Sequence, residues 1–214
     1  MRRFCLLLGL GCLAFIWLGP LLSVWRSSFA AHMLAHMGAV AVAAPLVGIG
    51  VSGWWPGRAR AGTAALALPL IASLVELIVV WGWHAPALRA LAETSTIITV
   101  IEQASFFLTG LLLWVFCIGA ANAGRSVVQA AGIFSLFVTS IHMTLLGALL
   151  ALSPRPLYGA EDVTCFGLVL NAQQDQEIGG VMMLVIGGVV YLAGGLTLLG
   201  KVLTDGSHME KAAH

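Results

Sequence analysis

Long apolar runs separated by short polar stretches dominate the chain. After a first run that ends near Val24, five more lie at about 29–51, 63–84, 95–119, 126–152 and 178–200. Each has the roughly 20 residues that a helix needs to cross the hydrocarbon core of a bilayer. Because backbone polar groups find no partners in lipid, each run is predicted to be helical. The pattern therefore predicts an all-α fold, a polytopic integral membrane bundle of about six transmembrane helices.

The composition supports this class and excludes others. Of the 214 residues, 60% are hydrophobic and only 9% are charged, which is far outside the range of soluble globular domains. The formal net charge is +1, and no basic cluster indicates a nucleic-acid partner. The four cysteines contain no CxxC pair and no spacing typical of a zinc site.

The runs divide the chain into three parts. Residues 1–28 are expected to form a first transmembrane helix or signal anchor, with a cleaved signal peptide as the alternative. Residues 29–200 are expected to form a five-helix membrane core, and residues 201–214 a short cytoplasmic tail.

The basic residues predict the orientation, because cytoplasmic loops carry an excess of lysine and arginine. If the chain begins inside, the outer side holds only Arg26, Arg89 and Arg155. The cytoplasmic side then holds Arg2, Arg3, Arg58, Arg60, Arg125, Lys201 and Lys211. Both termini are therefore predicted to be cytoplasmic, and the loop 153–177 is predicted to lie outside.

Two histidines four residues apart, His32 and His36, open the run at 29–51. On a helix they share one face, and Met33 and Met37 repeat the same spacing one position later. Ionisable side chains within a membrane helix usually mark a site. Imidazole and thioether ligands suit Cu(I), and haem iron is the alternative.

The other chemically distinctive residues fall at similar depth. In the predicted topology His84 lies at the outer end of its helix, and His142 lies about 14 Å from the outer end of another. Glu76, Glu102 and Asp175 also fall in the outer half or near the middle of the membrane. This segregation favours one outward-facing site over scattered histidines that only hydrogen-bond to neighbouring helices.

The predicted metal ligands are therefore His32, His36, His84 and His142. A ligating imidazole needs an orienting partner for its second nitrogen. Glu76, Glu102, Gln103 and Asp175 are the candidates for that role. Further thioether ligands are expected among Met33, Met37, Met143 and Met182.

Four segments together resemble a known family, the CtaG-type assembly factors of cytochrome c oxidase, which are associated with caa-type oxidases. The segments are His32-Met-x-x-His36-Met, Trp83-His84-Ala-Pro86, His142-Met-x-Leu-Leu-Gly147 with Ser153-Pro-Arg-Pro-Leu-Tyr158, and Asp175-Gln176 with Gly179-Gly180-x-Met182. The resemblance covers about residues 29–200. The chain departs from it at Glu102-Gln103, where many members carry a histidine.

The resemblance implies a non-enzymatic protein of the bacterial inner membrane that holds copper and delivers it to a haem–copper oxidase subunit. A soluble copper donor and membrane lipid are the other expected partners. Two further hypotheses come from the residues: a haem-binding redox protein of the b-type cytochrome kind, and a copper transporter. A transporter needs polar groups that continue through the inner half, where the sequence places almost none.

Overall fold

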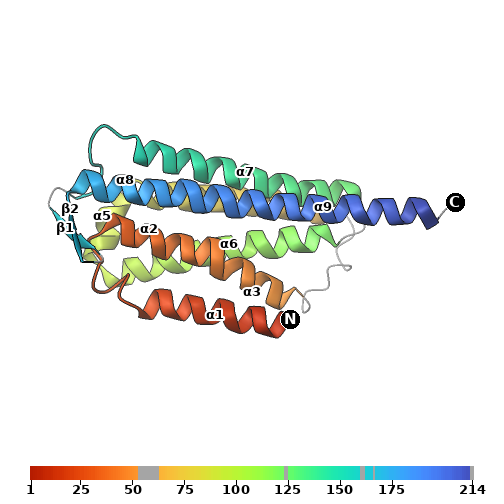
Figure 1. Ribbon diagram of the computed structural model, residues 1–214, viewed down its shortest axis with the longest axis horizontal. Helices are drawn as coiled ribbons and strands as arrows, with labels where there is room; N and C mark the ends of the chain where they lie inside the picture. The colour runs from red at the N-terminus through yellow and green to blue at the C-terminus, as the bar shows by residue number, and fades with distance from the viewer. Residues whose placement is uncertain (53–62, 123–124, 160–161, 166, 213–214) are drawn as a thin grey trace.

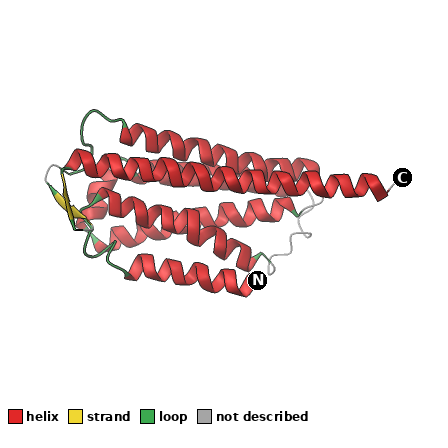
Figure 2. Ribbon diagram, in the orientation of Figure 1, coloured by secondary structure: helices red, strands yellow, loops and turns green. Residues whose placement is uncertain are grey.

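The computed structural model describes residues 1–52, 63–122, 125–159, 162–165 and 167–212, with residues 63–64 and 205–212 described by their backbone alone. It is a bundle of long helices with one small hairpin (Figures 1 and 2). The α-helices are α1 (Arg2–Leu18), α2 (Phe29–Met37), α3 (Ala44–Val51), α4 (Thr63–Trp83), α5 (Pro86–Thr94), α6 (Thr96–Ala121), α7 (Ser126–Ala151), α8 (Ala172–Met182) and α9 (Gly188–Ala212).

Two π-helical segments interrupt the long runs, η1 (Gly38–Ala43) between α2 and α3 and η2 (Met183–Gly187) between α8 and α9. The strands β1 (Val163–Cys165) and β2 (Leu168–Leu170) form an antiparallel hairpin. Neither the π-helices, the hairpin nor the short helix α5 was expected from the apolar pattern. A π-helix leaves the hydropathy of a run unchanged, so hydropathy cannot reveal it.

Five helical runs are long and apolar enough to cross a membrane, by length and composition: Phe29–Val51, Ala65–Trp83, Thr96–Ala121, Ser126–Ala151 and Ala172–Thr204. The predicted all-α membrane bundle is therefore confirmed. The helix expected in the first run is shorter than predicted, because α1 ends at Leu18 and turns follow. Its 17 residues span about 26 Å, slightly less than a hydrocarbon core of about 30 Å.

The last run also differs from its predicted bounds of 178–200. It begins at Ala172, where Asn171 and Gln174 form a reciprocal capping box, and it continues to Ala212. Asp175 therefore lies inside the first turn of α8 rather than before the helix. The predicted cytoplasmic residues Arg58 and Arg60 lie outside the described part of the chain.

The bundle has two distinct ends (Figure 1). Both chain termini lie at one end, and the C-terminal part of α9 projects beyond its neighbours. The hairpin, α5 and the beginnings of α2 and α8 lie at the opposite end. His32 and His36 belong to α2, which begins at this second end, His142 belongs to α7, which runs toward it, and His84 directly follows α4.

Close backbone contact joins α7 to the α8–η2 run. A Cβ atom added to Gly147 would lie 2.5 Å from the backbone nitrogen of Leu184, and one added to Gly180 would lie 2.5 Å from that of Ala151. Small residues let membrane helices approach this closely, which replaces the hydrophobic driving force that lipid does not supply. The glycines therefore set the separation between α7, which carries His142, and the last helical run.

The N-terminus of α2 is fixed from across the bundle by Asp175. The carboxylate accepts hydrogen bonds from the backbone nitrogens of Phe29, at 2.5 Å, and Ala30, at 3.1 Å. Ser28 is the N-cap of α2, and its hydroxyl accepts from the backbone nitrogen of Ala31. An anion at a helix N-terminus satisfies free N–H groups and offsets the helix dipole. The first turn of α2, which carries His32, is thereby held against α8.

Candidate metal centre

His32 and His36 lie one above the other on the inner face of α2, as their spacing predicts. Both are buried, and their nearly parallel rings lie 6.5 Å apart between centroids. The ring of Phe106 from α6 packs against His36 at a centroid distance of 3.9 Å. Neither ring nitrogen of His36 has a hydrogen-bond partner among the described residues.

His84 follows directly after α4 and joins this pair. Its ring centroid lies 6.0 Å from that of His32 and 5.4 Å from that of His36. The Nδ1 atom lies 2.6 Å from the carbonyl oxygen of Val80, which can only accept, so Nδ1 carries the proton. The buried Nε2 atom has no partner among the described residues and offers a lone pair.

Burial also keeps His84 neutral. The side chain lies one residue beyond the membrane span of α4, and desolvation lowers its pKa to about 4. The hydrogen bond to Val80 raises the pKa of His84, but the effect of desolvation is larger. Neutral imidazole is the form that binds metals, so His84 is ready to bind at neutral pH.

His142 brings a fourth imidazole from α7. It is 5% exposed, and neither ring nitrogen has a hydrogen-bond partner in the described part of the chain. It lies within electrostatic range of His36. Three helices, α2, α4 and α7, thus direct the four predicted histidines toward one buried region.

Three of the predicted methionines follow the histidines by one position and are fully buried: Met33, Met37 and Met143. The described contacts of Met33 and Met37 are with Gly179 of α8 and Gly187 of η2, so these side chains pack toward the last helical run. Gly187 of η2 lies between two of them, because a Cβ added there would be 2.9 Å from Cβ of Met143 and 3.7 Å from Sδ of Met37. Met182, the fourth predicted thioether, is only partly buried, whereas its neighbour Met183 is fully buried.

Arg89 is the main feature of the site that the sequence pattern did not predict, because the pattern placed it only as a positive charge in an outer loop. It lies on α5, is 4% exposed, and its Nη1 atom lies 3.0 Å from Nδ1 of His32. Its guanidinium also pairs with Glu93 at 3.2 Å and with Glu102 at 3.6 Å. An arginine among alanines and leucines, with a glutamate four residues later, is a signal that could have been recognised.

The carboxylates proposed to orient the histidines have different neighbours. Glu102 lies beside His32 and Arg89, with its Oε2 atom 3.6 Å from Nδ1 of His32. Glu76 accepts a hydrogen bond from the hydroxyl of Tyr191 at 2.7 Å. The hydrogen bonds described for Asp175 go to Ser28 and the backbone of α2. Of these three carboxylates, Glu102 is the one in described contact with a histidine.

Tyr158 supports the site from the loop after α7. Its hydroxyl donates to the carbonyl oxygen of His84 at 2.6 Å, and its ring stacks on Phe29 with centroids 4.2 Å apart. Phe29 in turn lies edge-on to the ring of His84. These contacts fix the backbone of His84 relative to the start of α2.

The separations of the rings, though not their present orientation, fit a shared metal ion. An imidazole centre lies about 3 Å from a metal bound by one of its nitrogens, so two ligands of one ion lie about 5 to 6 Å apart. The distances of 5.4 and 6.0 Å from His84 to His36 and His32 fall in this range. Among the described residues, however, no three His, Cys, Asp or Glu side chains form a ready metal site. Binding therefore requires the rings to rotate.

Comparison with known proteins gives one result. A search of curated proteins and a search of solved structures find no match. The family model for the cytochrome c oxidase caa3 assembly factor (Caa3_CtaG) matches residues 1–205, which is nearly the whole chain. The chain therefore belongs to the family of caa3-type cytochrome c oxidase assembly factors.

Proposed function

We propose that this assembly factor holds copper, as Cu(I), at the buried histidines and delivers it to a haem–copper oxidase subunit, without catalysing a reaction. The main support is the set of buried imidazole nitrogens on His36, His84 and His142 that lack hydrogen-bond partners among the described residues. Leaving polar atoms buried and unpaired is costly, so such atoms call for an explanation. A soft cation that binds one nitrogen of each of the three rings would supply one.

The surroundings suit a singly charged, soft ion. The fully buried Met37 and Met143 each follow a site histidine by one position, and neutral sulfur and nitrogen donors do not require a second charge for balance. Neutral nitrogen and sulfur donors therefore favour Cu(I) over a divalent ion.

Haem is less well supported. Phe106 lies 3.9 Å from His36, and the rings of His32, His36 and His84 are 5.4 to 6.5 Å apart, so side chains fill the space between the histidines. A planar porphyrin would have to displace Phe106 and separate the helices.

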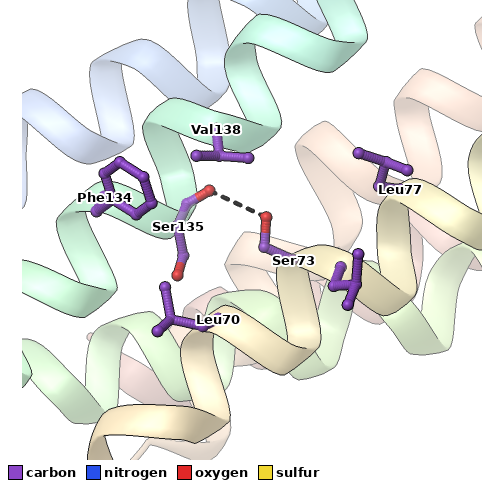
Figure 3. Close-up of a pocket in the computed structure, with 7 residues that line it drawn as sticks. Leu70, Ser73, Leu77, Phe134, Ser135 and Val138 are labelled. Carbon is purple, nitrogen blue, oxygen red and sulfur yellow. Dashed lines mark hydrogen bonds between the residues drawn. The ribbon is translucent and has the colours of Figure 1, made fainter.

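A transporter is also less well supported. On the side of Glu76 away from His84, Ser73 of α4 contacts Thr139 and the carbonyl oxygen of Ser135 on α7. A pocket of about 130 Å³ lies there between the two helices, lined by Leu70, Ser73, Leu74, Leu77, Phe134, Ser135 and Val138 (Figure 3). None of these residues is ionisable or carries sulfur, so the pocket offers no ligand to continue a copper path.

The proposed location is the bacterial inner membrane, with the site at the outer side and both termini in the cytoplasm. Both termini lie at one end of the bundle, and the beginning of α2, which carries His32 and His36, lies at the other (Figure 1). Copper from a soluble donor outside the cytoplasm would then reach the site without crossing the membrane.

The direct test is metal analysis and a visible spectrum of detergent-purified protein, followed by Cu(I) competition with a chromophoric chelator. The proposal expects about one copper per chain and no Soret band. His36→Gln and His142→Gln should each weaken Cu(I) binding by at least about tenfold, since loss of a ligand costs at least as much as loss of its orienting partner. His208→Gln, in the C-terminal tail, is the histidine control. Wild-type protein that binds no Cu(I), or a Soret band, would overturn the proposal.

A further inference from the structure

Arg89 is held in place from several sides. Its Nε atom pairs with Glu93 one turn later on α5, and its Nη1 atom faces Glu102 of α6. Its Nη2 atom donates to the carbonyl oxygen of Arg26 at 3.4 Å. With two carboxylates and a carbonyl around it, the buried guanidinium has little freedom to turn away from its remaining neighbour, His32.

The contact between Arg89 and His32 identifies the tautomer of this histidine. A guanidinium has only donors and stays protonated in proteins. At 3.0 Å, Nη1 of Arg89 and Nδ1 of His32 are at hydrogen-bond distance, so Nδ1 must be the acceptor. A neutral His32 that accepts at Nδ1 carries its proton on Nε2.

The other protonation states of His32, with a proton on Nδ1, fit the observed contacts less well. A proton on Nδ1 of His32 could point toward Glu102, but that oxygen lies 3.6 Å away, beyond hydrogen-bond distance. The proton would also face the donor of Arg89 at 3.0 Å. A doubly protonated His32 would place two cations in contact within a buried region, with the same conflict.

His84 carries its proton on the opposite nitrogen. Its Nδ1 atom donates to Val80, which leaves the lone pair on Nε2. In His32 the Nδ1 lone pair is taken by Arg89, and Nε2 is a donor. Two imidazoles whose ring centroids lie only 6.0 Å apart therefore carry their protons on opposite ring nitrogens.

We propose that Arg89 is a positioning residue that holds His32 in the Nε2–H tautomer and so keeps it out of the copper ligands. The donors are then His36, His84 and His142. The tautomer assignment depends on the geometry of Arg89 alone. The exclusion of His32 from the ligand set rests, in addition, on the proposed copper function.

The tautomer is tested on metal-free protein by ¹⁵N NMR of histidine-labelled full-length chain in lipid bilayers. The chain has six histidines, and loss of one signal set in His32→Gln assigns His32. The expected result is a protonated Nε2 and an unprotonated Nδ1 for His32, with the reverse for His84. A proton on Nδ1 of His32 would overturn the proposal, whether or not the protein binds copper.

Arg89→Met combined with Glu102→Gln tests the role of the guanidinium, because the pair of changes leaves no unbalanced carboxylate at Glu102. The His32 signals should shift to a mixture of tautomers in this variant. Arg26→Met is the control, since the side chain of Arg26 donates to Thr96, Thr99 and Ala92 and not to His32. Retention of the pure Nε2–H form without Arg89 would show that Arg89 does not set it.

Copper competition separates this inference from the proposed function. His32→Gln keeps an acceptor for Arg89 and should leave Cu(I) affinity at the wild-type value. His36→Gln should lower the affinity by at least about tenfold. Equal losses in the two variants would overturn the exclusion of His32 while supporting a copper site. Wild-type protein that binds no Cu(I) would overturn the copper function and with it the ligand assignment, and the NMR result would still decide the tautomer.

Discussion

The carboxylate of Asp175 and the hydroxyl of Ser28 lie 2.7 Å apart, which joins the first turn of α8 to the N-cap of α2 across 147 positions of sequence. Both residues are buried. The same carboxylate accepts from two backbone nitrogens of α2, so one side chain satisfies three donors. The position of His32 in the bundle depends on this connection.

Asp175→Ala should destabilise the protein strongly, because it leaves three buried donors without an acceptor. At about 1 kcal/mol or more for each donor, the free energy of unfolding should fall by at least about 3 kcal/mol. Asp175→Asn keeps one acceptor oxygen, so its free energy of unfolding should lie between those of Asp175→Ala and wild type. Thermal unfolding in one detergent measures the difference. The exposed Glu177→Gln is the control, and equal melting temperatures for it and Asp175→Ala would contradict the capping role.

Gly180→Ala should also destabilise the protein, by about 1–3 kcal/mol, because the new Cβ would meet the backbone of Ala151 at 2.5 Å. Backbone cannot move aside as a flexible side chain can, so α7 and α8 must separate. Gly82→Ala in α4 is the matched control, since its Cβ would have no neighbour within 4 Å. Alanine favours the helix there, so this control should be neutral or slightly stabilising. The same unfolding assay compares them, and similar behaviour of the two variants would show that α7–α8 contact tolerates a methyl group.

Tyr191→Phe should lower the free energy of unfolding by about 1–3 kcal/mol, because the buried carboxyl of Glu76 loses its donor at 2.7 Å. The interaction is best isolated with a double-mutant cycle that adds Glu76→Gln. The tyrosine substitution should cost less in the glutamine background than in wild type. Strictly additive costs would mean that the two residues contribute independently.

Tyr158 should make stability depend on alkaline pH. Burial raises the pKa of its phenol, so the folded protein keeps the proton at pH values where the unfolded chain, with an ordinary tyrosine pKa of about 10, releases it. The contribution of Tyr158 to the free energy of unfolding is unaffected below pH 10 and is lost as the pH rises above 10. The loss amounts to at most about 1.4 kcal/mol per pH unit. Wild type should therefore lose stability more steeply above pH 10 than Tyr158→Phe, and parallel curves would contradict the assignment.

Hydropathy and spacing predicted the parts of this structure that depend on local sequence. The i, i+4 spacing of His32 and His36 predicted a shared helix face, and the rings do lie one above the other. The apolar runs predicted the helices that bring His84 and His142 to the same end of the bundle. Those conclusions need only the helical period and the length of a membrane span.

Features that depend on partners distant in sequence could not be predicted in this way. Asp175 binds residues nearly 150 positions away, and Arg89 reaches His32 from a helix that hydropathy does not reveal. The choice between Met182 and Met183 depends on the rotation of one helix about its axis. Successive residues differ by about 100° on a helix, and Met183 lies on the face of the run that already buries Gln176, Gly179 and Gly180, whereas Met182 lies to one side of it.

The depth of the histidines has a kinetic consequence. All four are at most 5% exposed, so no ligand from a donor or acceptor protein can reach an ion among them until side chains or helices move. For a protein that holds copper there as proposed, the rate at which a chelator removes the copper should then rise with chelator concentration only to a plateau, which equals the opening rate of the protein. An ion held at the surface would instead be removed in proportion to the chelator present. If the protein holds copper as proposed, the timing of its release therefore resides in the assembly factor itself.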